Sequence, residues 1–241
     1  ISIPPASPES PAPLPPWRQP HNVLAAHRAR FGEKAPVWVF GYASLIWRPE
    51  FESLEHRPAV AAGWHRCLRM RSRINRGTPE LPGLVFCLLN GGTCKGVVFR
   101  VAQQSWRDDL TRLWAREMFT GVYEPLWLTC RTPQGPVRAL AFTLDRLLPN
   151  HSGPIADDAM LDILRHARGR YGTTLDYLLD TARGLREHGI RAIALNTVED
   201  SGALPIECDV ASFSTGDVIT VKPYEGKVFN TKGELLAERS G

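Results

Sequence analysis

The chain has 241 residues, of which 43% are hydrophobic and 22% are charged, and its formal net charge is +4. These fractions are typical of a globular protein with one sizeable core, and the mild charge, with no Lys-rich run and no nucleic-acid motif, argues against a nucleic-acid partner. No apolar run approaches the roughly 20 residues of a membrane-spanning helix, and the N-terminus has no signal-peptide core, so we expect a cytoplasmic protein without a membrane partner.

Residues 1–20 contain eight prolines among serines and alanines. Such a composition cannot bury a core and favours extended conformations, which predicts a disordered tail. Residues 21–191 are expected to form the globular domain. It begins with a short helix over 22–31, where apolar residues lie near helical spacing.

The stretch from Val37 to Phe40 is an apolar run that predicts a buried strand, and Gly41 ends it before a turn of small and polar residues. Such a turn exposes backbone N–H groups next to the hydroxyls of Tyr42 and Ser44. Together these donors suit a carboxylate or a developing oxyanion. Taken alone, the segment fits an ordinary strand end with a glycine turn at least as well.

The middle of the chain alternates strand and helix patterns. Strands are expected over 84–89, 94–101, 122–130 and 137–144, with Asn90-Gly91-Gly92 as a hairpin turn. Helices are expected from a Ser105 cap to Glu117, over 157–168, and over 173–188. The last helix has a capping box at its start, Gly189 as its stop, and an apolar stripe made of Leu175, Leu178, Leu179, Ala182 and Leu185. This order predicts an α+β domain with a mostly antiparallel, curved sheet.

Three arginines, Arg69, Arg71 and Arg73, alternate along the chain. On a strand, alternation places their guanidinium groups on one face. A solvated face is the more common reading of such a pattern. The alternative is a cleft that attracts an anionic small substrate.

Metal and cofactor motifs are missing from the sequence. The five cysteines include no Cys-x-x-Cys pair, and the seven histidines show no His-Glu-x-x-His spacing. The sequence has neither a P-loop nor a dinucleotide-binding fingerprint. We therefore expect free, mostly buried thiols, no metal and no cofactor.

Glu117 is the best candidate for a catalytic carboxylate. It lies at the end of a predicted helix, where the helix dipole disfavours an acidic residue, and it is followed by the apolar Met118 and Phe119. An apolar environment would raise its pKa toward neutrality, where a carboxyl group acts both as base and as acid. A surface ion pair with Arg116 is the simpler alternative.

Four segments together resemble the ChaC-type γ-glutamylcyclotransferases. They are F-G-Y-A-S-L-I-W at 40–47, R-G-T-P-E-L-P-G-L-V at 76–85, W-A-R-E-M-F-T-G-V-Y at 114–123 and Y-G-T-T-L-D-Y-L at 171–178. The resemblance runs from about residue 37 to residue 191, and several motifs in one order are more specific than any one of them. It implies a γ-glutamylcyclotransferase-like fold with a curved, mostly antiparallel, barrel-like sheet flanked by helices.

The resemblance also implies an activity and a site. It implies that the substrate is glutathione, cleaved in the cytosol to 5-oxoproline and cysteinylglycine, and that Glu117 matches the family's catalytic glutamate. The γ-glutamyl group would be held by a loop made of Gly41, Tyr42, Ala43, Ser44, Leu45 and Ile46. The usual loop of the family reads G-Y-G-S-L. Ala43 therefore replaces a glycine, which would add strain if the position needed a positive φ.

Residues 192–241 do not follow that pattern. The stretch over about 196–237 resembles a fragment of aconitase B, with strands expected over 217–221 and 226–230. It contains one cysteine, Cys208, against the three thiolates that an aconitase cluster needs, so we expect no iron–sulfur cluster. A fusion segment and a loosely packed tail remain alternatives.

Two other functions compete with cleavage of glutathione. A related cyclotransferase would act on other γ-glutamyl amines or peptides. A non-catalytic protein would bind a γ-glutamyl group without turning it over.

Overall fold

The computed structural model describes residues 15–32, 34–102, 104–190, 219–222 and 227–238. The contacts between residues divide the chain into two compact units, Ile1–Arg191 and Ala192–Gly241. The predicted tail over 1–20 lies outside the described residues as far as residue 14, and its remainder is helical rather than extended. A 3-10 helix, η1 (Pro16–Arg18), leads into α1 (Pro20–Phe31).

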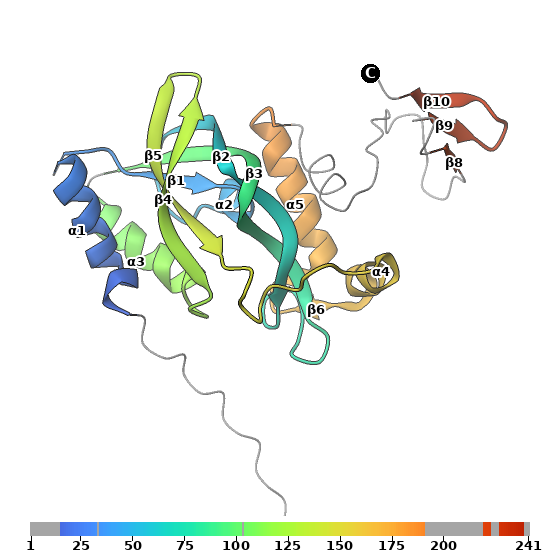
Figure 1. Cartoon of the computed structure of the whole chain (residues 1–241), viewed down its shortest axis with the longest axis horizontal. Helices are drawn as coiled ribbons and strands as arrows, with labels where there is room; N and C mark the ends of the chain where they lie inside the picture. The colour runs from blue at the N-terminus through green and yellow to red at the C-terminus, as the bar shows by residue number, and fades with distance from the viewer. Residues whose placement is uncertain (1–14, 33, 103, 191–218, 223–226, 239–241) are drawn as a thin grey trace, which may run out of the picture. The chain divides into compact units, whose positions relative to one another are not determined.

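A closed five-stranded barrel forms the centre of the first unit (Figure 1). Its strands are β1 (Trp38–Gly41), β2 (Ser53–Ser72), β3 (Gly83–Val101), β4 (Tyr123–Thr132) and β5 (Gly135–Leu144). They are ordered β1-β3-β2-β4-β5, and every neighbouring pair is antiparallel except β1 and β5, which close the barrel in parallel. The predicted curved, mostly antiparallel sheet is confirmed.

The barrel core consists of the inward side chains of these strands. Val39 and Phe40 of β1, Phe86 and Leu88 of β3 and Phe142 of β5 are each no more than 1% exposed. Burial of such side chains stabilises each by about 1.5–3 kcal/mol, which is why the apolar runs read from the sequence become these strands.

The hairpin predicted at Asn90-Gly91-Gly92 does not exist, because β3 continues through it. Gly91 and Gly92 have φ values of 95° and 70°, and the β2–β3 register shifts between Ala62 and Trp64. The two glycines thus form a bulge opposite the Gly63 region of β2. A bulge needs the same positive φ as a tight turn, which explains why the sequence signal for the two is alike.

Helices flank the barrel on two sides. Figure 1 shows α1 and α3 (Trp106–Glu117) near β4 and β5, and α5 (Thr174–Glu187) beside β2 and β3. The ring of His27 in α1 stacks on that of Trp127 in β4, with 4.0 Å between centroids. Trp114 Nε1 of α3 donates to Arg18 O at 2.7 Å, which anchors η1 on α3.

The start of α3 differs from the predicted cap. The Ser105 side chain makes no capping hydrogen bond and instead donates its hydroxyl proton to Asp109 Oδ2 at 2.6 Å. Asp109 is buried and also pairs with Arg112. These donors satisfy the buried carboxylate of Asp109. Because the Ser105 hydroxyl is one of them, it does not cap the helix terminus.

The helix α5 begins with the predicted capping box, Thr173 with Asp176, but buries a different face. Leu175 and Leu179 are about half exposed, whereas Thr174, Tyr177, Thr181, Gly184 and Leu185 are buried. The predicted apolar stripe is therefore wrong at Leu175 and Leu179 and confirmed at Leu185, while Leu178 and Ala182 are half-buried. Thr174 Oγ1 accepts from Leu84 N at 2.8 Å and Tyr177 Oη from Phe86 N at 3.2 Å, so the hydroxyls of α5 satisfy the edge of β3.

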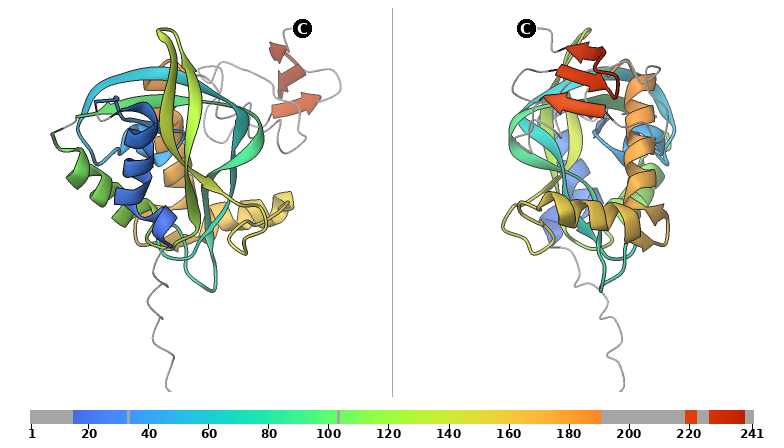
Figure 2. Two further views of the ribbon diagram at one scale, coloured as in Figure 1. Left: turned by 60° about the vertical axis from the view of Figure 1, so that its left-hand side comes forward. Right: turned by 90° about the vertical axis from the view of Figure 1, so that its right-hand side faces the viewer.

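The helix α4 (Asp157–His166) comes before α5, and the right view of Figure 2 shows it crossing below α5. It ends two residues before the predicted limit because Arg168–Gly169 forms β6, which pairs with β7 (Gly172–Thr173).

None of the described helices is both long and apolar enough to cross a membrane. Cys67, Cys87, Cys94 and Cys130 are buried, as predicted, and Cys208 lies outside the described residues.

The second unit contains an antiparallel sheet ordered β10-β9-β8. Its strands are β8 (Ile219–Lys222), β9 (Lys227–Asn230) and β10 (Leu235–Glu238). In the turn between β9 and β10, Asn230 Oδ1 accepts from Lys232 N and Glu234 N at 2.9 Å. The two strands predicted in this segment are present, and a third joins them.

Candidate active site

The loop after β1 leaves the barrel as a tight turn into α2 (Ser44–Trp47). A Cβ atom on Gly41 would lie 3.0 Å from the Phe99 ring and 3.3 Å from the Ile46 side chain, so this close approach requires glycine. Ala43 has a φ of −147°, which an L-residue adopts. The exchange of glycine for alanine therefore adds no left-handed strain to the loop.

Glu117, the last residue of α3, meets this loop at a small cavity of about 20 Å³. The cavity is lined by Tyr42, Ala43, Ser44, Leu45, Phe86, Glu117, Tyr123, Phe142 and Tyr177. The structure thus brings four of the six predicted loop residues to the candidate catalytic carboxylate. The other two, Gly41 and Ile46, are buried beside the turn and line no part of this cavity.

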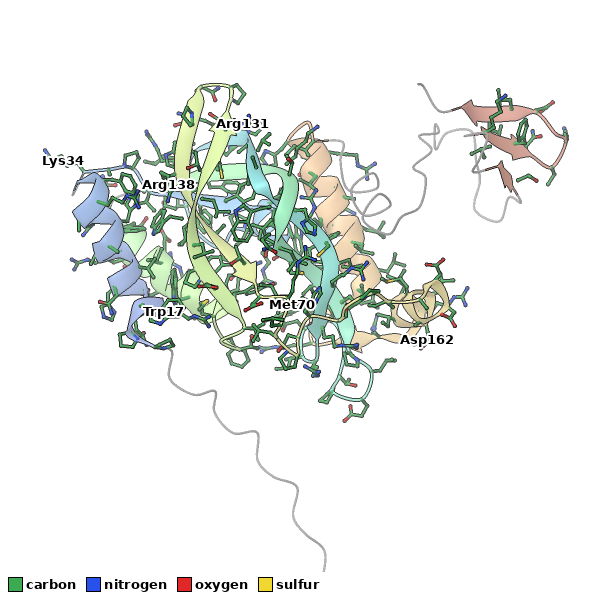
Figure 3. All side chains as sticks on the ribbon, in the orientation of Figure 1. Trp17, Lys34, Met70, Arg131, Arg138 and Asp162 are labelled. Carbon is green, nitrogen blue, oxygen red and sulfur yellow. The ribbon has the colours of Figure 1, made fainter. Side chains whose placement is uncertain are left out.

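A second cavity, of about 510 Å³, adjoins the first. Ser44, Glu117, Tyr123 and Tyr177 line both, so the small cavity is the inner end of the large one. Met70, labelled in Figure 3 below the centre of the barrel in that view, lines the large cavity together with residues 71–76. A ligand that reaches Glu117 through the large cavity can extend along these residues.

The Glu117 carboxyl group is largely buried and lies next to the guanidinium group of Arg116. Its side chain is 12% exposed, and its Oε1 lies 3.1 Å from Arg116 Nε. Burial raises the pKa of Glu117 above its usual value; Arg116 works against the rise and the Glu50 carboxylate adds to it. The Glu117 side chain therefore forms the ion pair with Arg116 that the sequence suggested as an alternative, and its pKa is raised as well.

Glu50 fixes the arginine that contacts Glu117. Arg116 Nη1 lies 3.5 Å from Glu50 Oε2 and donates to Arg48 O, while Arg48 Nε lies 2.6 Å from Glu50 Oε1. Glu50 has a φ of 58°, a conformation that is rare for residues other than glycine and recurs at functional sites. This network orients Arg116 beside the candidate catalytic carboxylate.

Tyr123 and Tyr177 line the candidate site but were not predicted as site residues, although Tyr123 ends one of the four family-like segments and Tyr177 is the last residue but one of another. Tyr42 Oη donates to Phe142 O at 2.9 Å, and Tyr177 Oη accepts from Phe86 N. Burial raises the pKa of all three tyrosines, so they remain neutral donors near neutral pH. Only the fold brings them together, because Tyr42 comes from the turn after β1, Tyr123 from β4 and Tyr177 from α5.

The three alternating arginines do not share one environment. Arg71 and Arg73 line the large cavity, whereas Arg69 Nη1 donates to Gly153 O at 2.6 Å and lies outside it. The β2–β3 register shifts between Cys67 and Met70, so the simple alternation breaks there. The substrate-attracting alternative therefore applies to two of the three.

The part of the chain that the structure describes holds no group of three or more His, Cys, Asp or Glu side chains placed to bind a metal ion. The charged lining of the large cavity instead comprises six arginines and two glutamates. A buried carboxyl group thus lies beside a wall of mainly positive charge.

The family model of ChaC-like proteins matches residues 37–203. The chain belongs to the ChaC-like family. This ChaC-like chain is 34% identical over 174 residues to the glutathione-specific gamma-glutamylcyclotransferase of Escherichia coli (strain K12), with 72% of the chain and 75% of that relative covered. A crystal structure of a glutathione-specific γ-glutamylcyclotransferase from yeast superposes with a TM-score of 0.57 over 64% of this chain and 88% of that one, at 18% identity, which shows the shared fold.

The C-terminal segment of the ChaC-like chain has a different relationship. The family model for the N-terminus of aconitate hydratase 2 matches residues 186–240. Aconitate hydratase B of a Synechocystis strain is 62% identical over 47 residues, which are 20% of this chain and 5% of that protein. The segment is thus an aconitase B-like fragment, as predicted, and spans a small part of that enzyme.

Proposed function

We propose that this protein is a γ-glutamylcyclotransferase that cleaves glutathione into 5-oxoproline and cysteinylglycine. One observation carries the proposal: Glu117, with its raised pKa, meets the Tyr42–Leu45 turn at the inner end of a cavity large enough for a peptide. Family membership and a relative named for the same activity support it.

Glu117 would act first as the general base. The γ-glutamyl α-ammonium loses a proton to the Glu117 carboxylate, and the free amine attacks its own γ-carbonyl carbon to close a five-membered ring. The tetrahedral intermediate then collapses as the bond between the γ-carbon and the cysteine nitrogen breaks. Glu117 returns its proton to that nitrogen. It then takes the second proton from the ring nitrogen and passes it to the released amine, so the lactam nitrogen keeps one hydrogen, the product amine leaves as an ammonium, and the reaction needs neither water nor a cofactor.

The turn and the tyrosines would supply the remaining interactions. Backbone amides near Tyr42 to Leu45 would stabilise the oxyanion that forms on the γ-carbonyl. The neutral hydroxyls of Tyr123 and Tyr177 would orient the γ-glutamyl group beside Glu117. The protein's main task is to fold the substrate so that its amine and carbonyl meet.

The same proposal covers location and partners. We place the activity in the cytoplasm, on a free small molecule, with no nucleic-acid or membrane partner. A cyclotransferase for other γ-glutamyl amines and a non-catalytic binding protein are the competing functions, and the substrate comparison below separates them.

The test uses three compounds: glutathione, γ-glutamyl-alanine, and a glutathione analogue that lacks the α-amine. We expect equal amounts of 5-oxoproline and cysteinylglycine from glutathione and no cleavage of the analogue, because it has no internal nucleophile. Cleavage of the analogue would show hydrolysis and refute the cyclisation. Turnover of γ-glutamyl-alanine instead of glutathione would establish the broader cyclotransferase, and no product from folded protein would indicate a binding protein.

A further inference from the structure

The six arginines of the large cavity divide into two groups by their partners. Arg48 and Arg116 pair with Glu50, and Arg116 also with Glu117. Arg76 is buried, and its Nη1 donates to the carbonyl oxygens of Tyr171 and Thr173. The charges and donors of these three arginines are therefore engaged within the protein.

Arg71, Arg73 and Arg170 form the second group, which we call the outer arginines. Within the part of the chain that the structure describes, none of them forms an ion pair with a carboxylate, although Arg170 lies over the Tyr171 ring at 5.2 Å. Arg71 is half-buried, and Arg73 and Arg170 are exposed. They therefore lie toward the mouth of the cavity, while Tyr123 and Tyr177 at the inner end are buried.

Three unpaired guanidinium groups around one cavity repel one another and bind an anion well. Arginine is suited to carboxylates because its planar fork donates two parallel hydrogen bonds. The cavity wall also limits screening by water compared with an open surface. This mouth therefore favours a ligand that carries a carboxylate at the end far from Glu117.

We propose that the outer arginines bind the C-terminal carboxylate of a γ-glutamyl peptide and so select peptides over γ-glutamyl amines. The inference rests on the proposed function, since it assumes that the γ-glutamyl end lies beside Glu117. A tripeptide extends to roughly 10 Å, so its terminal carboxylate leaves the inner end of the cavity. Glutathione has such a carboxylate at its glycine, and γ-glutamyl-amines do not.

The experiment compares glutathione with its glycine amide, in which the terminal carboxylate is replaced by a neutral carboxamide. Wild type is expected to favour glutathione about tenfold or more in kcat/KM, mainly through KM, as expected for a charge-assisted contact. The double variant Arg71→Gln/Arg73→Gln should lose about tenfold for glutathione and less than twofold for the amide. Its KM for glutathione should also depend less on salt than that of wild type.

Arg168→Gln is the matched control, because Arg168 is an exposed arginine two residues from Arg170 and lies outside the cavity. It should leave both kcat/KM values unchanged. A merely structural effect of the double variant would lower turnover of both substrates alike, and that result would overturn the inference. Equal use of the two substrates by wild type would overturn it as well while leaving the proposed function intact.

Equilibrium binding separates this inference from the failure of the activity. Titrating wild type and Glu117→Gln with both compounds measures carboxylate recognition without chemistry. Preferred binding of glutathione by a protein that does not cleave it would support the outer arginines and refute the proposed function. Equal affinities for the two compounds would refute the carboxylate site, whatever the turnover.

Discussion

Glu117 combines a charge with burial, and this lowers stability in a way that the proposed role of Glu117 as general base explains. Burial raises its pKa in the folded protein, so the neutral carboxyl contributes stability that is fully present below the usual value of 4.5 and is lost as pH rises through the folded value. A glutamine carries no such charge at any pH. Active-site residues of this kind trade stability for activity.

We therefore expect Glu117→Gln to raise the melting temperature at pH 7–8 by about 2–4 °C, the shift that roughly 1 kcal/mol causes in a domain of this size. The gap between variant and wild type should shrink as the pH falls to about 4, where Glu117 is protonated in wild type. Thermal unfolding of both proteins across this pH range measures the gap. A variant that melts below wild type at pH 7 would show that the ionised side chain stabilises the fold.

If Glu117 is the proposed base, the charges around it should set the acid side of the pH–activity profile. Arg116 lowers the pKa of Glu117, so Arg116→Gln should raise that pKa and move the acid limb of kcat/KM to higher pH. Glu50 raises it, so Glu50→Gln should move the limb to lower pH. Profiles of the three proteins with glutathione test the signs. Shifts in the same direction for both variants would contradict the assignment of Glu117 as the titrating base.

Among single residues, sequence reasoning found those that stand out from their immediate neighbours in the chain. Gly41 to Ser44 form a turn after an apolar run, and Glu117 is an acid at an unfavourable helix position, so both features are visible in a short window. Tyr123 and Tyr177 carry no such local signal. Their hydroxyls become site groups only because β4 and α5 meet at the same cavity.

At the scale of elements, α5 supports the substrate loop through one close contact. A Cβ atom on Gly184 would lie 3.1 Å from Trp47 Cβ and 3.2 Å from Ile46 Cγ2, so the glycine allows α5 to lie directly on α2. Trp47 Nε1 also donates to Thr181 Oγ1 at 3.1 Å. The position of α2, which begins at Ser44, depends on this packing.

Replacing Gly184 with leucine should displace α2 and raise KM for glutathione by about tenfold or more. Overpacking of this kind costs about 1–3 kcal/mol, so the protein should still fold. Arg186→Leu adds the same side chain at an exposed position of the same helix and should change KM less than twofold. Steady-state kinetics with thermal melts compare the two variants. Unchanged KM in Gly184→Leu would show that α5 does not position the loop.

The sequence predicted which segments are strands and helices better than it predicted how they pair. Apolar runs mark β1, β3, β4 and β5 because burial of these side chains drives their formation. The glycines at 91 and 92 signal positive φ, which a turn and a bulge share, so their role depends on the partner strand. The buried face of α5 carries Thr174 and Tyr177, whose hydroxyls satisfy β3, and a search for apolar stripes overlooks such a face.

At the scale of the whole molecule, the contacts divide the chain after Arg191, and the two family relationships differ on either side. We propose that residues 21–191 form the catalytic domain and that residues 192–241 are not needed for its chemistry. Glu117, the turn at 41–46 and the outer arginines all belong to the first unit. The aconitase-like relationship covers only 5% of the Synechocystis enzyme, which gives no basis for aconitase activity.

A chain that ends at Arg191 should therefore fold and cleave glutathione with kcat/KM within about twofold of the full chain. The chain of residues 1–241 should show no aconitase activity with added iron and sulfide. Kinetics and circular dichroism of both chains provide the comparison. A folded but inactive shorter chain would show that the C-terminal segment takes part in the site.

Composition and motif order predicted the class of the molecule, because they depend on many residues at once. Four motifs in one order identified the family, and the two family matches, over 37–203 and 186–240, overlap around the predicted boundary at 191.

Turnover of glutathione by Glu117→Gln tests the central claim most directly. Glutamine keeps the shape of the side chain and removes the base, and general acid–base catalysis contributes about 10²- to 10⁴-fold. We predict a loss of that size in kcat, measured as 5-oxoproline released, with glutathione binding retained. A variant that keeps kcat within about tenfold of wild type would contradict the account, because the proton would then have to leave the α-ammonium by a route that does not include Glu117.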